Sequence, residues 1–315
     1  SYSLSSGDIE EGCYRISVKR ETAPDHSTDA SADEQVCDGL ASNFLLDHVE
    51  EGHQVFVKGP LGQFFLPPNS TDPIALISMG IGITPLYSIL EHAVNQKLDN
   101  TIYFIHGTKN SSTQLFREKL AQLKLGTHPN ITMHIAHSQA NKVYQDPEDY
   151  QENPESYQQN PEDYQIEGRL KPQNIMDIVK TPSVQFYLCG THAFMETMYE
   201  GLLKWGVDEK NIHYEYFVKS KPLGRQAQND VAHEVHFTRS NMKAIWSPTS
   251  GSLLDLAEEN GISVPFGCRY GVCEACSVKL TKGAVEEDEN IAELNTRDAI
   301  LLCSTRPSSD LELDL

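Results

Sequence analysis

The sequence Pro265-Phe266-Gly267-Cys268-Arg269-Tyr270-Gly271-Val272-Cys273-Glu274-Ala275-Cys276 has three cysteines spaced C-x4-C-x2-C, and a fourth, Cys303, follows downstream. Four thiolates at this spacing are typical of a plant-type [2Fe–2S] site. Gly267 and Gly271 would let the loop backbone fold around the inorganic sulfides. A structural zinc site is the alternative, but such sites usually pair two short cysteine knuckles. The predicted metal ligands are Cys268, Cys273, Cys276 and Cys303.

The overall composition narrows the class of protein. The chain has 315 residues, enough for two or three domains, and 25 basic against 45 acidic residues give a net charge of −20. This balance argues against nucleic acid or an anionic membrane as partner. Seven cysteines, four of them assigned to the cluster, favour a reducing compartment: the cytoplasm, with the mitochondrial matrix as the alternative. No signal peptide is recognisable, and Ser1 suggests a truncated piece of a longer protein with a fused N-terminal domain.

Residues 1–70 are predicted to be β-rich and to form part of a β-barrel. Tyr14–Lys19 alternates in polarity as a half-buried strand does, and Gln54–Lys58 is a second candidate strand. Ser42 is predicted to cap a short helix that ends before Gly52.

Residues 71–218 alternate between short apolar strands and helices, which predicts a doubly wound parallel sheet, so the fold class is α/β plus β. Pro85 is placed at the first helical position, where its missing N–H has no effect. The expected strands are 74–78, 101–106, 131–136, 184–188 and 212–217, and the expected helices start at Thr84 or cover 113–123, 172–179 and 192–205.

A tandem repeat interrupts this pattern at residues 139–166, where Tyr144, Tyr150, Tyr157 and Tyr164 each precede a Gln. Residues 144–165 hold seven acids and no Lys or Arg, so we expect a disordered insertion in a surface loop. A polar linker over 219–233 precedes a compact unit over 234–315 that contains the cysteines.

Two segments point to a dinucleotide. Ser78-Met79-Gly80-Ile81-Gly82-Ile83-Thr84-Pro85 is a glycine turn between the first strand and helix of the alternating region, where backbone N–H groups can approach a pyrophosphate. Cys189-Gly190 ends a later strand, and ligands of such sheets lie at the carboxyl ends of strands. Each signal is weak alone, since such a glycine turn or buried cysteine is often only structural.

Tyr2-Ser3-Leu4-Ser5 places an aromatic ring beside hydroxyls, a combination that can stack on a flavin and hydrogen-bond its edge. Together with Gly39-Leu40-Ala41-Ser42, the glycine turn, Cys189-Gly190 and Glu215-Tyr216-Phe217, this order of motifs resembles the plant-type ferredoxin-NADP reductase superfamily. The appended C-terminal ferredoxin makes the chain similar to the phthalate dioxygenase reductase branch, and hybrid-cluster-protein reductases and MOSC-fused reductase modules share the layout. The resemblance covers nearly the whole chain except the repeat.

The resemblance implies a partial flavin-binding barrel over 1–70, an NAD(P)-binding domain over 71–218 and a β-grasp ferredoxin domain over 234–315. It implies catalytic roles for Ser3 near flavin N5, for Cys189 at the nicotinamide and for Glu215 beside the flavin. The residues implied to bind flavin or nucleotide are Tyr2, Ser3, Leu4, Ser5, Val18, Lys19, Gly39, Ser42, Gly80, Gly82, Thr84, Pro85, His106, Cys189, Gly190 and Phe217.

The expected activity is that of an NAD(P)H-dependent iron–sulfur flavoprotein reductase. NAD(P)H would deliver a hydride to the flavin, which would pass single electrons to the cluster and on to a protein acceptor, either an oxygenase or a fused MOSC-type domain. FAD and FMN stay open, and a single cation in Thr108-Lys109-Asn110-Ser111 favours NADH slightly over NADPH. The alternatives are a ferredoxin-like electron carrier with degenerate reductase domains and a non-redox module that uses the tyrosine repeat.

Overall fold

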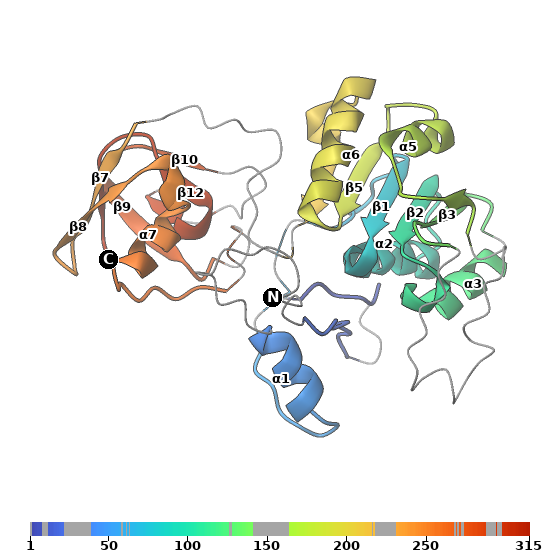
Figure 1. Cartoon of the computed structure of the whole chain (residues 1–315), viewed down its shortest axis with the longest axis horizontal. Helices are drawn as coiled ribbons and strands as arrows, with labels where there is room; N and C mark the ends of the chain where they lie inside the picture. The colour runs from blue at the N-terminus through green and yellow to red at the C-terminus, as the bar shows by residue number, and fades with distance from the viewer. Residues whose placement is uncertain are drawn as a thin grey trace.

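The computed structural model describes residues 2–7, 12–21, 39–57, 59–60, 62, 64–125, 128–140, 164–215, 217, 231–267, 269, 271, 274–287, 294 and 298–315. Two sheets form separate bodies, and Figure 1 shows α1 (Leu40–His48) with the N-terminal segments below and between them. Most of the predicted insertion and linker lies outside the described residues, as do Tyr216, Cys268 and Cys273.

The larger sheet has six parallel strands in the order β4-β3-β2-β1-β5-β6. The chain leaves β1 for β2 on one side and returns to β5 on the other, so the strand order reverses between β1 and β5. Ligands of open α/β sheets bind at such a reversal, outside the carboxyl ends of the strands. The strands are β1 (Ile74–Met79), β2 (Ile102–Thr108), β3 (Ile131–His137), β4 (Ile166–Glu167), β5 (Gln185–Cys189) and β6 (Ile212–Glu215).

Helices cover both faces of this sheet, as the doubly wound prediction requires. Leu76 and Phe104 pack with α2 (Ile83–Asn95) and α3 (Arg117–Leu125), whereas Ile77 and Ile105 pack with α5 (Pro172–Val179) and α6 (His192–Trp205). These four side chains are fully buried, and burying each contributes about 1.5–3 kcal/mol. Burial on both faces explains why the strands read as continuous apolar runs.

The second sheet has five strands in the order β11-β9-β13-β7-β8, with a separate pair β10-β12. Helix α7 (Leu253–Glu259), capped by the Ser252 side chain, packs on it over a core that includes Trp246 and Leu301. The strands are β7 (His233–Phe237), β8 (Met242–Trp246), β9 (Ser277–Lys282), β10 (Val285–Glu287), β11 (Ala299–Leu301), β12 (Thr305–Pro307) and β13 (Leu311–Leu313).

Residues 2–21 differ from the predicted strand pattern. Among the described residues, segments 2–7 and 12–21 are extended and meet in one antiparallel bridge between Leu4 and Ile16. The predicted strand at Tyr14–Lys19 therefore has no ladder, and residues 53–57 form no strand either, with Lys58 outside the described part. A polarity pattern specifies an extended backbone, but a strand also requires a hydrogen-bonded neighbour.

Three helix starts also differ from prediction. Helix α1 begins at Leu40 after Gly39, because the Ser42 hydroxyl accepts from the Glu21 amide at 3.2 Å instead of capping the helix. Helix α2 begins at Ile83 after a 3₁₀ turn, which places Pro85 at the third helical position, where the backbone N–H still has no intrahelical acceptor.

Helix α3 begins later than predicted, at Arg117, because Asn110 caps a 3₁₀ turn and Phe116 has a φ of 55°. The 3₁₀ helices are η1 (Gly80–Gly82), η2 (Ser111–Thr113), η5 (Glu209–Asn211), η6 (Pro248–Ser250) and η7 (Leu302–Ser304).

None of the helices in the described part of the chain has the length and apolarity to span a bilayer.

Candidate functional site

A row of polar side chains crosses the carboxyl edge of the parallel sheet. In register, His106 on β2 lies opposite Ser78 on β1, Ser78 lies opposite Cys189 on β5, and Cys189 lies opposite Glu215 on β6. Because paired residues of neighbouring strands lie on the same side of a sheet, the four side chains share one face. The face is the one covered by α2 and lies at the strand-order reversal.

Ser3 completes this row from the N-terminal segment. Its Oγ donates to Glu215 Oε2 at 2.7 Å, which joins residues 212 positions apart. Burial raises the pKa of the Glu215 carboxyl, and the hydrogen bond from Ser3 opposes this by favouring the charged form. The carboxyl therefore holds a proton to higher pH than an exposed glutamate, while its oxygen stays fixed by a hydroxyl donor.

Cys189 is fully buried at the centre of the row. Burial raises the pKa of its thiol well above the ordinary value, and the neighbouring Glu215 charge raises it further. A thiol in this environment stays neutral and is a poor nucleophile. A soft, polarizable and neutral thiol suits contact with a planar ring, which is the role that the resemblance implies.

The glycine turn brings the first turn of α2 directly against the end of β5. A Cβ on Gly82 would lie 2.2 Å from the Cys189 carbonyl oxygen, so only glycine permits this approach. Gly80 has a φ of 56°, and a Cβ on Gly190 would lie 2.8 Å from Phe194 Cδ1. The two segments predicted to bind the nucleotide are therefore one contiguous surface at a helix N-terminus, which suits an anionic phosphate.

Thr84 and His106 are both buried, but they differ in their contacts. Thr84 Oγ1 donates to the Ile81 carbonyl at 3.1 Å and so closes the turn. His106 Nδ1 lies 2.8 Å from Ser78 Oγ. Burial, aided by His137, lowers the pKa of His106 to about 3, so the ring is neutral at physiological pH. Pro85 is buried beside Thr84 in the same turn.

The residues predicted to contact the flavin lie on the N-terminal segments and at the end of β6. Tyr2 and Phe217 expose 37% and 38% of their surface, so both rings are available for stacking. Ser5 is fully buried, Leu4 forms the bridge with Ile16, Val18 is half-buried and Lys19 is exposed. The four positions Tyr2, Leu4, Val18 and Lys19 thus keep accessible surface, whereas Ser5 serves the packing of its segment.

Gly39 and Ser42 lie together at the start of α1. Ser42 Oγ donates to the Gly39 carbonyl at 3.0 Å, and a Cβ on Gly39 would lie 2.9 Å from both Ser42 Oγ and Glu21 Cβ. The start of α1 is therefore packed closely against the end of segment 12–21, which carries Lys19.

The cluster loop lies next to the five-stranded sheet. Cys276 and Cys303 are 2% and 8% exposed, and the Gly271 amide donates to Cys303 Sγ at 3.2 Å. An N–H donor on sulfur stabilises a thiolate, which is the ligand form of cysteine. The described residues contain no group of three or more metal-binding side chains, and Cys268 and Cys273 lie outside them. In the described part of the loop, buried Cys276 and Cys303 and the Gly271 amide fit the predicted cluster.

Of the two glycines predicted to shape the cluster loop, Gly271 has a φ of 83° and Gly267 has no positive φ. Among the described residues of the loop, Arg269 at 63° and Glu274 at 56° are left-handed as well. Arg269 forms two hydrogen bonds to the Glu258 carboxylate on α7, at 2.5 and 2.9 Å. This bidentate ion pair stabilises a backbone conformation that L-residues rarely adopt.

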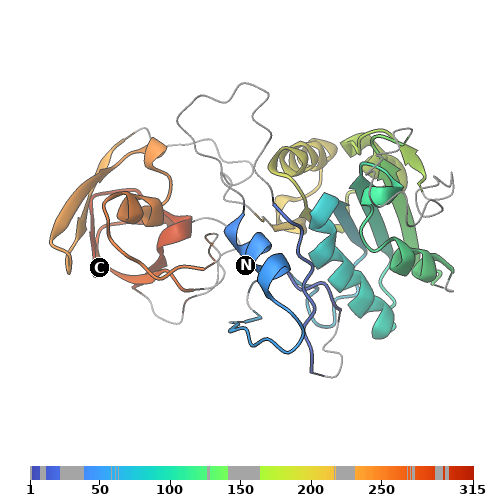
Figure 2. The ribbon, with the colours of Figure 1, turned by 60° about the horizontal axis from the view of Figure 1, so that its bottom comes forward.

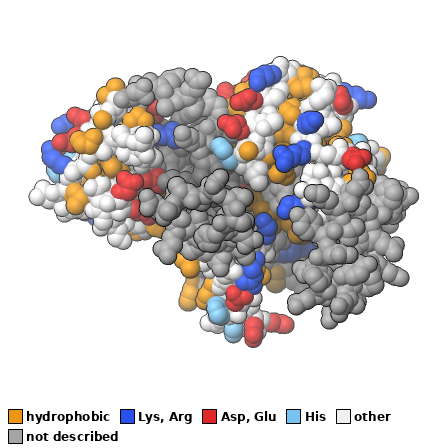
Figure 3. All heavy atoms as spheres, viewed as in Figure 1, with side chains coloured by type: hydrophobic (Ala, Val, Ile, Leu, Met, Phe, Trp, Pro, Cys, Tyr) orange, Lys and Arg blue, Asp and Glu red, His pale blue; other side chains and the backbone are white. Residues whose placement is uncertain are grey.

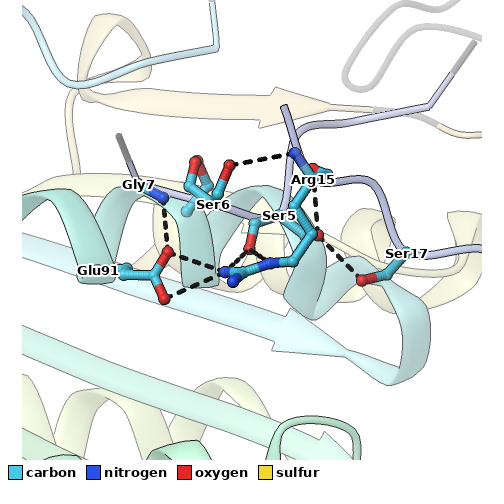
Figure 4. A network of polar contacts seen from close by, with 7 residues as sticks. Ser5, Ser6, Gly7, Arg15, Ser17 and Glu91 are labelled. Atoms are coloured by element: carbon cyan, nitrogen blue, oxygen red, sulfur yellow. Dashed lines mark hydrogen bonds and ion pairs between the residues drawn. The ribbon is translucent and has the colours of Figure 1, made fainter. Parts of the chain in front are cut away.

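Sequence reasoning missed an ion pair that holds the N-terminal segments on α2. Arg15 Nη2 lies 2.8 Å from Glu91 Oε2, and the same oxygen accepts the Gly7 amide at 2.7 Å (Figure 4). Arg15 and Glu91 are 76 residues apart, and no local pattern links them. Only their charges could have suggested the pair, and the chain holds 70 charged residues from which to choose.

Two family descriptions match the chain. Residues 76–200 match the oxidoreductase NAD-binding domain, and residues 241–308 match the 2Fe-2S iron-sulfur cluster binding domain. The first range covers the parallel sheet from β1 into α6, and the second covers the cysteine loop and Cys303.

Among curated proteins, the flavohemoprotein of Bacillus cereus is 32% identical over 216 residues, which is 69% of this chain and 47% of that protein. The chain thus spans about half the length of the curated relatives it matches. An intact type IV self-sufficient cytochrome P450 monooxygenase covers 100% of this chain with 35% of its own, at a TM-score of 0.61 and 16% identity.

The ferredoxin reductase in carbazole 1,9a-dioxygenase covers 69% of this chain with 55% of its own, at a TM-score of 0.50 and 17% identity. At these low identities the two structures show only a similar fold. The cytochrome P450 monooxygenase matches over the whole chain, and the ferredoxin reductase over 69% of it. The chain therefore contains an oxidoreductase NAD-binding domain followed by a 2Fe-2S iron-sulfur cluster binding domain, the two domains that the resemblance predicted in this order.

Proposed function

We propose that this chain is the reductase part of an NAD(P)H-dependent iron–sulfur flavoprotein that delivers electrons to a protein acceptor. The observation that carries the proposal is the contact of Ser3 with Glu215 beside Cys189. Three residues from distant parts of the chain, each assigned to the reaction centre by resemblance, meet at the sheet edge where ligands bind. The domain limits 1–70, 71–218 and 234–315 belong to the same proposal.

The bound groups supply the redox chemistry: the nicotinamide gives two electrons as a hydride, the flavin accepts them, and the cluster carries them singly. The side chains orient these groups and control the local charge. Glu215 and Ser3 form a fixed hydrogen-bonded pair at the edge of the site, and Cys189 places a buried neutral thiol beside them. The exposed rings of Tyr2 and Phe217 would hold the flavin by stacking.

The nucleotide phosphates bind at the first turn of α2. Gly80 and Gly82 keep that turn free of side chains, and Thr84 closes it. Figure 3 shows Lys and Arg side chains along the middle of one face, directly above α1, on a chain whose net charge is −20. Positive charge on this face above α1 favours the binding of anionic cofactors. Either NADH or NADPH satisfies this chemistry, and we favour NADH.

Cys268, Cys273, Cys276 and Cys303 hold the cluster, with the Gly271 amide on one sulfur. A chain of seven cysteines, four of them assigned to the cluster, fits a reducing compartment such as the cytoplasm. The acceptor is an oxygenase or a fused MOSC-type domain that takes electrons one at a time from the cluster.

The test is an anaerobic titration of the flavin- and cluster-loaded protein with NADH and then NADPH, followed by visible absorption. We expect the flavin bands and the broader cluster absorption to bleach together, and the more effective nucleotide identifies the donor. Flavin and cluster bands that neither nucleotide bleaches would contradict the reductase function and leave an electron carrier.

Two cysteine variants separate the cluster from the rest. Cys303→Ser should lose cluster absorption while NADH still bleaches the flavin. Cys13→Ser changes an exposed cysteine outside the cluster loop. In this variant NADH should bleach both the flavin bands and the cluster absorption, as in the parent. Retention of the full cluster spectrum in Cys303→Ser would overturn the assigned ligand set.

A further inference from the structure

The N-terminal segment, residues 2–7, lies on α2 over a short stretch. The Gly7 amide donates to Glu91 Oε2 at 2.7 Å, and Ser88 Oγ donates to the Ser6 carbonyl at 2.7 Å. A Cβ on Gly7 would lie 2.1 Å from the His92 amide nitrogen, so the segment's backbone is in direct contact with the helix backbone. Figure 2 shows this segment running alongside α2.

Arg15 joins the second N-terminal segment to the same point. Its Nη2 lies 2.8 and 3.1 Å from the two Glu91 oxygens, and its Nε donates to the Ser5 carbonyl at 3.0 Å. Ser17 Oγ donates to Ser5 Oγ at 3.0 Å, which adds a further link between the two segments (Figure 4). One guanidinium thus connects residues 2–7, residues 12–21 and α2.

The pair is sheltered enough for its charges to interact strongly. The side chains of Arg15 and Glu91 are 32% and 14% exposed. Burial pushes the pKa of Glu91 upward, but the Gly7 amide and the Arg15 guanidinium outweigh it and hold that pKa below its ordinary value. The carboxylate is therefore ionised and accepts hydrogen bonds from the Gly7 amide and from Arg15 Nη2, so its position is well determined.

Residues 2–7 and helix α2, which the Arg15–Glu91 pair joins, carry different parts of the proposed reaction centre. Residues 2–5 hold the predicted flavin contacts, and Ser3 reaches Glu215 on β6. Glu91 lies seven residues after Thr84, about two helical turns along α2 from the predicted phosphate-binding turn. Because α2 is a single rigid helix, fixing Glu91 to residues 2–7 also fixes the phosphate-binding turn relative to the flavin contacts.

We propose that the Arg15–Glu91 ion pair is a positioning element of the reductase: it sets the spacing between the residues that contact flavin and the helix that binds the nucleotide. The pair acts through the segments it joins, and Arg15 reaches the predicted flavin contacts only through the Ser5 backbone carbonyl. The inference rests on the proposed function and identifies two residues that the resemblance did not.

The first variant to test is Glu91→Gln, which keeps an oxygen for the Gly7 amide and removes the charge that attracts Arg15. Stopped-flow mixing of the flavin-loaded protein with NADH should show flavin reduction slowed about tenfold, because a small misplacement lowers transfer rates steeply. The long-wavelength charge-transfer absorption between nicotinamide and flavin should weaken. The KM for NADH should stay within about twofold of the parent value, since the phosphate-binding turn itself is unchanged.

A second readout does not depend on activity. Amide hydrogen exchange of residues 2–7 should be faster in Glu91→Gln than in the parent, with unchanged exchange in β1 and β5 showing that the sheet is folded. Arg15→Lys keeps the positive charge but loses the bidentate contact with Glu91. We expect its rate of flavin reduction to lie between the rates of Glu91→Gln and the parent.

The matched control is Asp47→Asn. It breaks an Arg–carboxylate pair at 2.6 Å between Arg20, which lies on segment 12–21 like Arg15, and Asp47 on α1. This variant should keep the parent rate of flavin reduction and the parent charge-transfer band.

Each possible result either supports or contradicts the positioning role of the Arg15–Glu91 pair. Parent-like rate, charge-transfer band and exchange in Glu91→Gln would overturn the positioning role, as would equal losses in Glu91→Gln and Asp47→Asn. A parent protein whose flavin neither nucleotide reduces would overturn the proposed function itself, together with the role derived from it. A slowed Glu91→Gln beside an unaffected Asp47→Asn supports the inference.

Discussion

Ser3 Oγ donates a hydrogen bond to Glu215 Oε2 at 2.7 Å, so the N-terminal segment and the last strand of the parallel sheet meet at one buried carboxyl. The contact places a hydroxyl donor on a glutamate whose pKa is raised by burial. It also closes the polar row that runs across the carboxyl edge from His106. Two segments from opposite ends of the reductase region thus share one hydrogen bond at the proposed reaction centre.

Ser3→Ala should raise the pKa of Glu215 further, because the variant removes the one interaction that favours the charged carboxylate. A hydrogen bond to a charged group contributes about 1.5–3 kcal/mol, so we expect NADH-driven flavin reduction to slow at least about tenfold. The measurement is the pH profile of flavin reduction, whose Glu215-dependent step should move to higher pH. Thr197→Ala, which removes an exposed hydroxyl on α6, is the control. An unmoved profile in Ser3→Ala would contradict the assigned pairing.

Gly82→Ala should disturb the junction between α2 and β5. The added Cβ would meet the Cys189 backbone 2.2 Å away, and backbone cannot turn aside as a side chain does. We expect a loss of about 1–3 kcal/mol in the free energy of unfolding, measured by urea denaturation, and a higher KM for NADH. Gly107→Ala provides the comparison, since its Cβ would meet Leu170 Cβ at an ordinary 3.6 Å. Equal losses in the two variants would contradict the close approach at Gly82.

The buried ring of His106 predicts acid sensitivity. Its pKa is lowered from 6.5 to about 3, so below pH 6.5 the unfolded chain binds a proton that the folded chain does not. Stability should therefore fall as pH drops from 6.5 towards 3, with a slope that approaches about 1.4 kcal/mol per pH unit from this group. Above pH 6.5 the contribution is constant.

His106→Gln removes the titrating ring, so its urea midpoint should change less between pH 7 and pH 5 than the parent midpoint, by about 1–2 kcal/mol in unfolding free energy. The exposed His192 on α6 gives the control variant His192→Gln, which should follow the parent curve. The prediction fails if His106→Gln and the parent lose stability in parallel over this range.

Glu258→Gln should loosen the cluster loop. The carboxylate holds Arg269 by two hydrogen bonds while Arg269 occupies a left-handed backbone conformation. Loss of about 1 kcal/mol would speed the thermal decay of the cluster's visible absorption about fivefold. Glu234→Gln breaks an exposed ion pair with Lys243 on the same sheet and should leave the decay unchanged. Parent-like decay in Glu258→Gln would show that the ion pair does not support the loop.

Local patterns in the sequence determined much of this protein. The short apolar runs of Ile74–Met79 and Gln185–Cys189 predict strands buried on both faces, because the strands of a covered parallel sheet are nearly continuously apolar. The cysteine spacing specifies the cluster, because loop ligands must lie close in sequence to reach the same metal centre. Helices α5 and α6 begin and end where their residues predict, at Pro172–Val179 and His192–Trp205.

Only the tertiary structure decided which residues meet. Ser42 was predicted as a cap, but the hydroxyl binds the Glu21 amide, a partner 21 positions away that no local rule selects. Arg15 and Glu91 carry charges like many others in the chain, and they become a pair because the N-terminal segment packs on α2. Sequence patterns therefore determined most elements of the parallel sheet, whereas contacts between distant residues depend on how those elements pack. The row from His106 to Ser3 exists only in the folded chain.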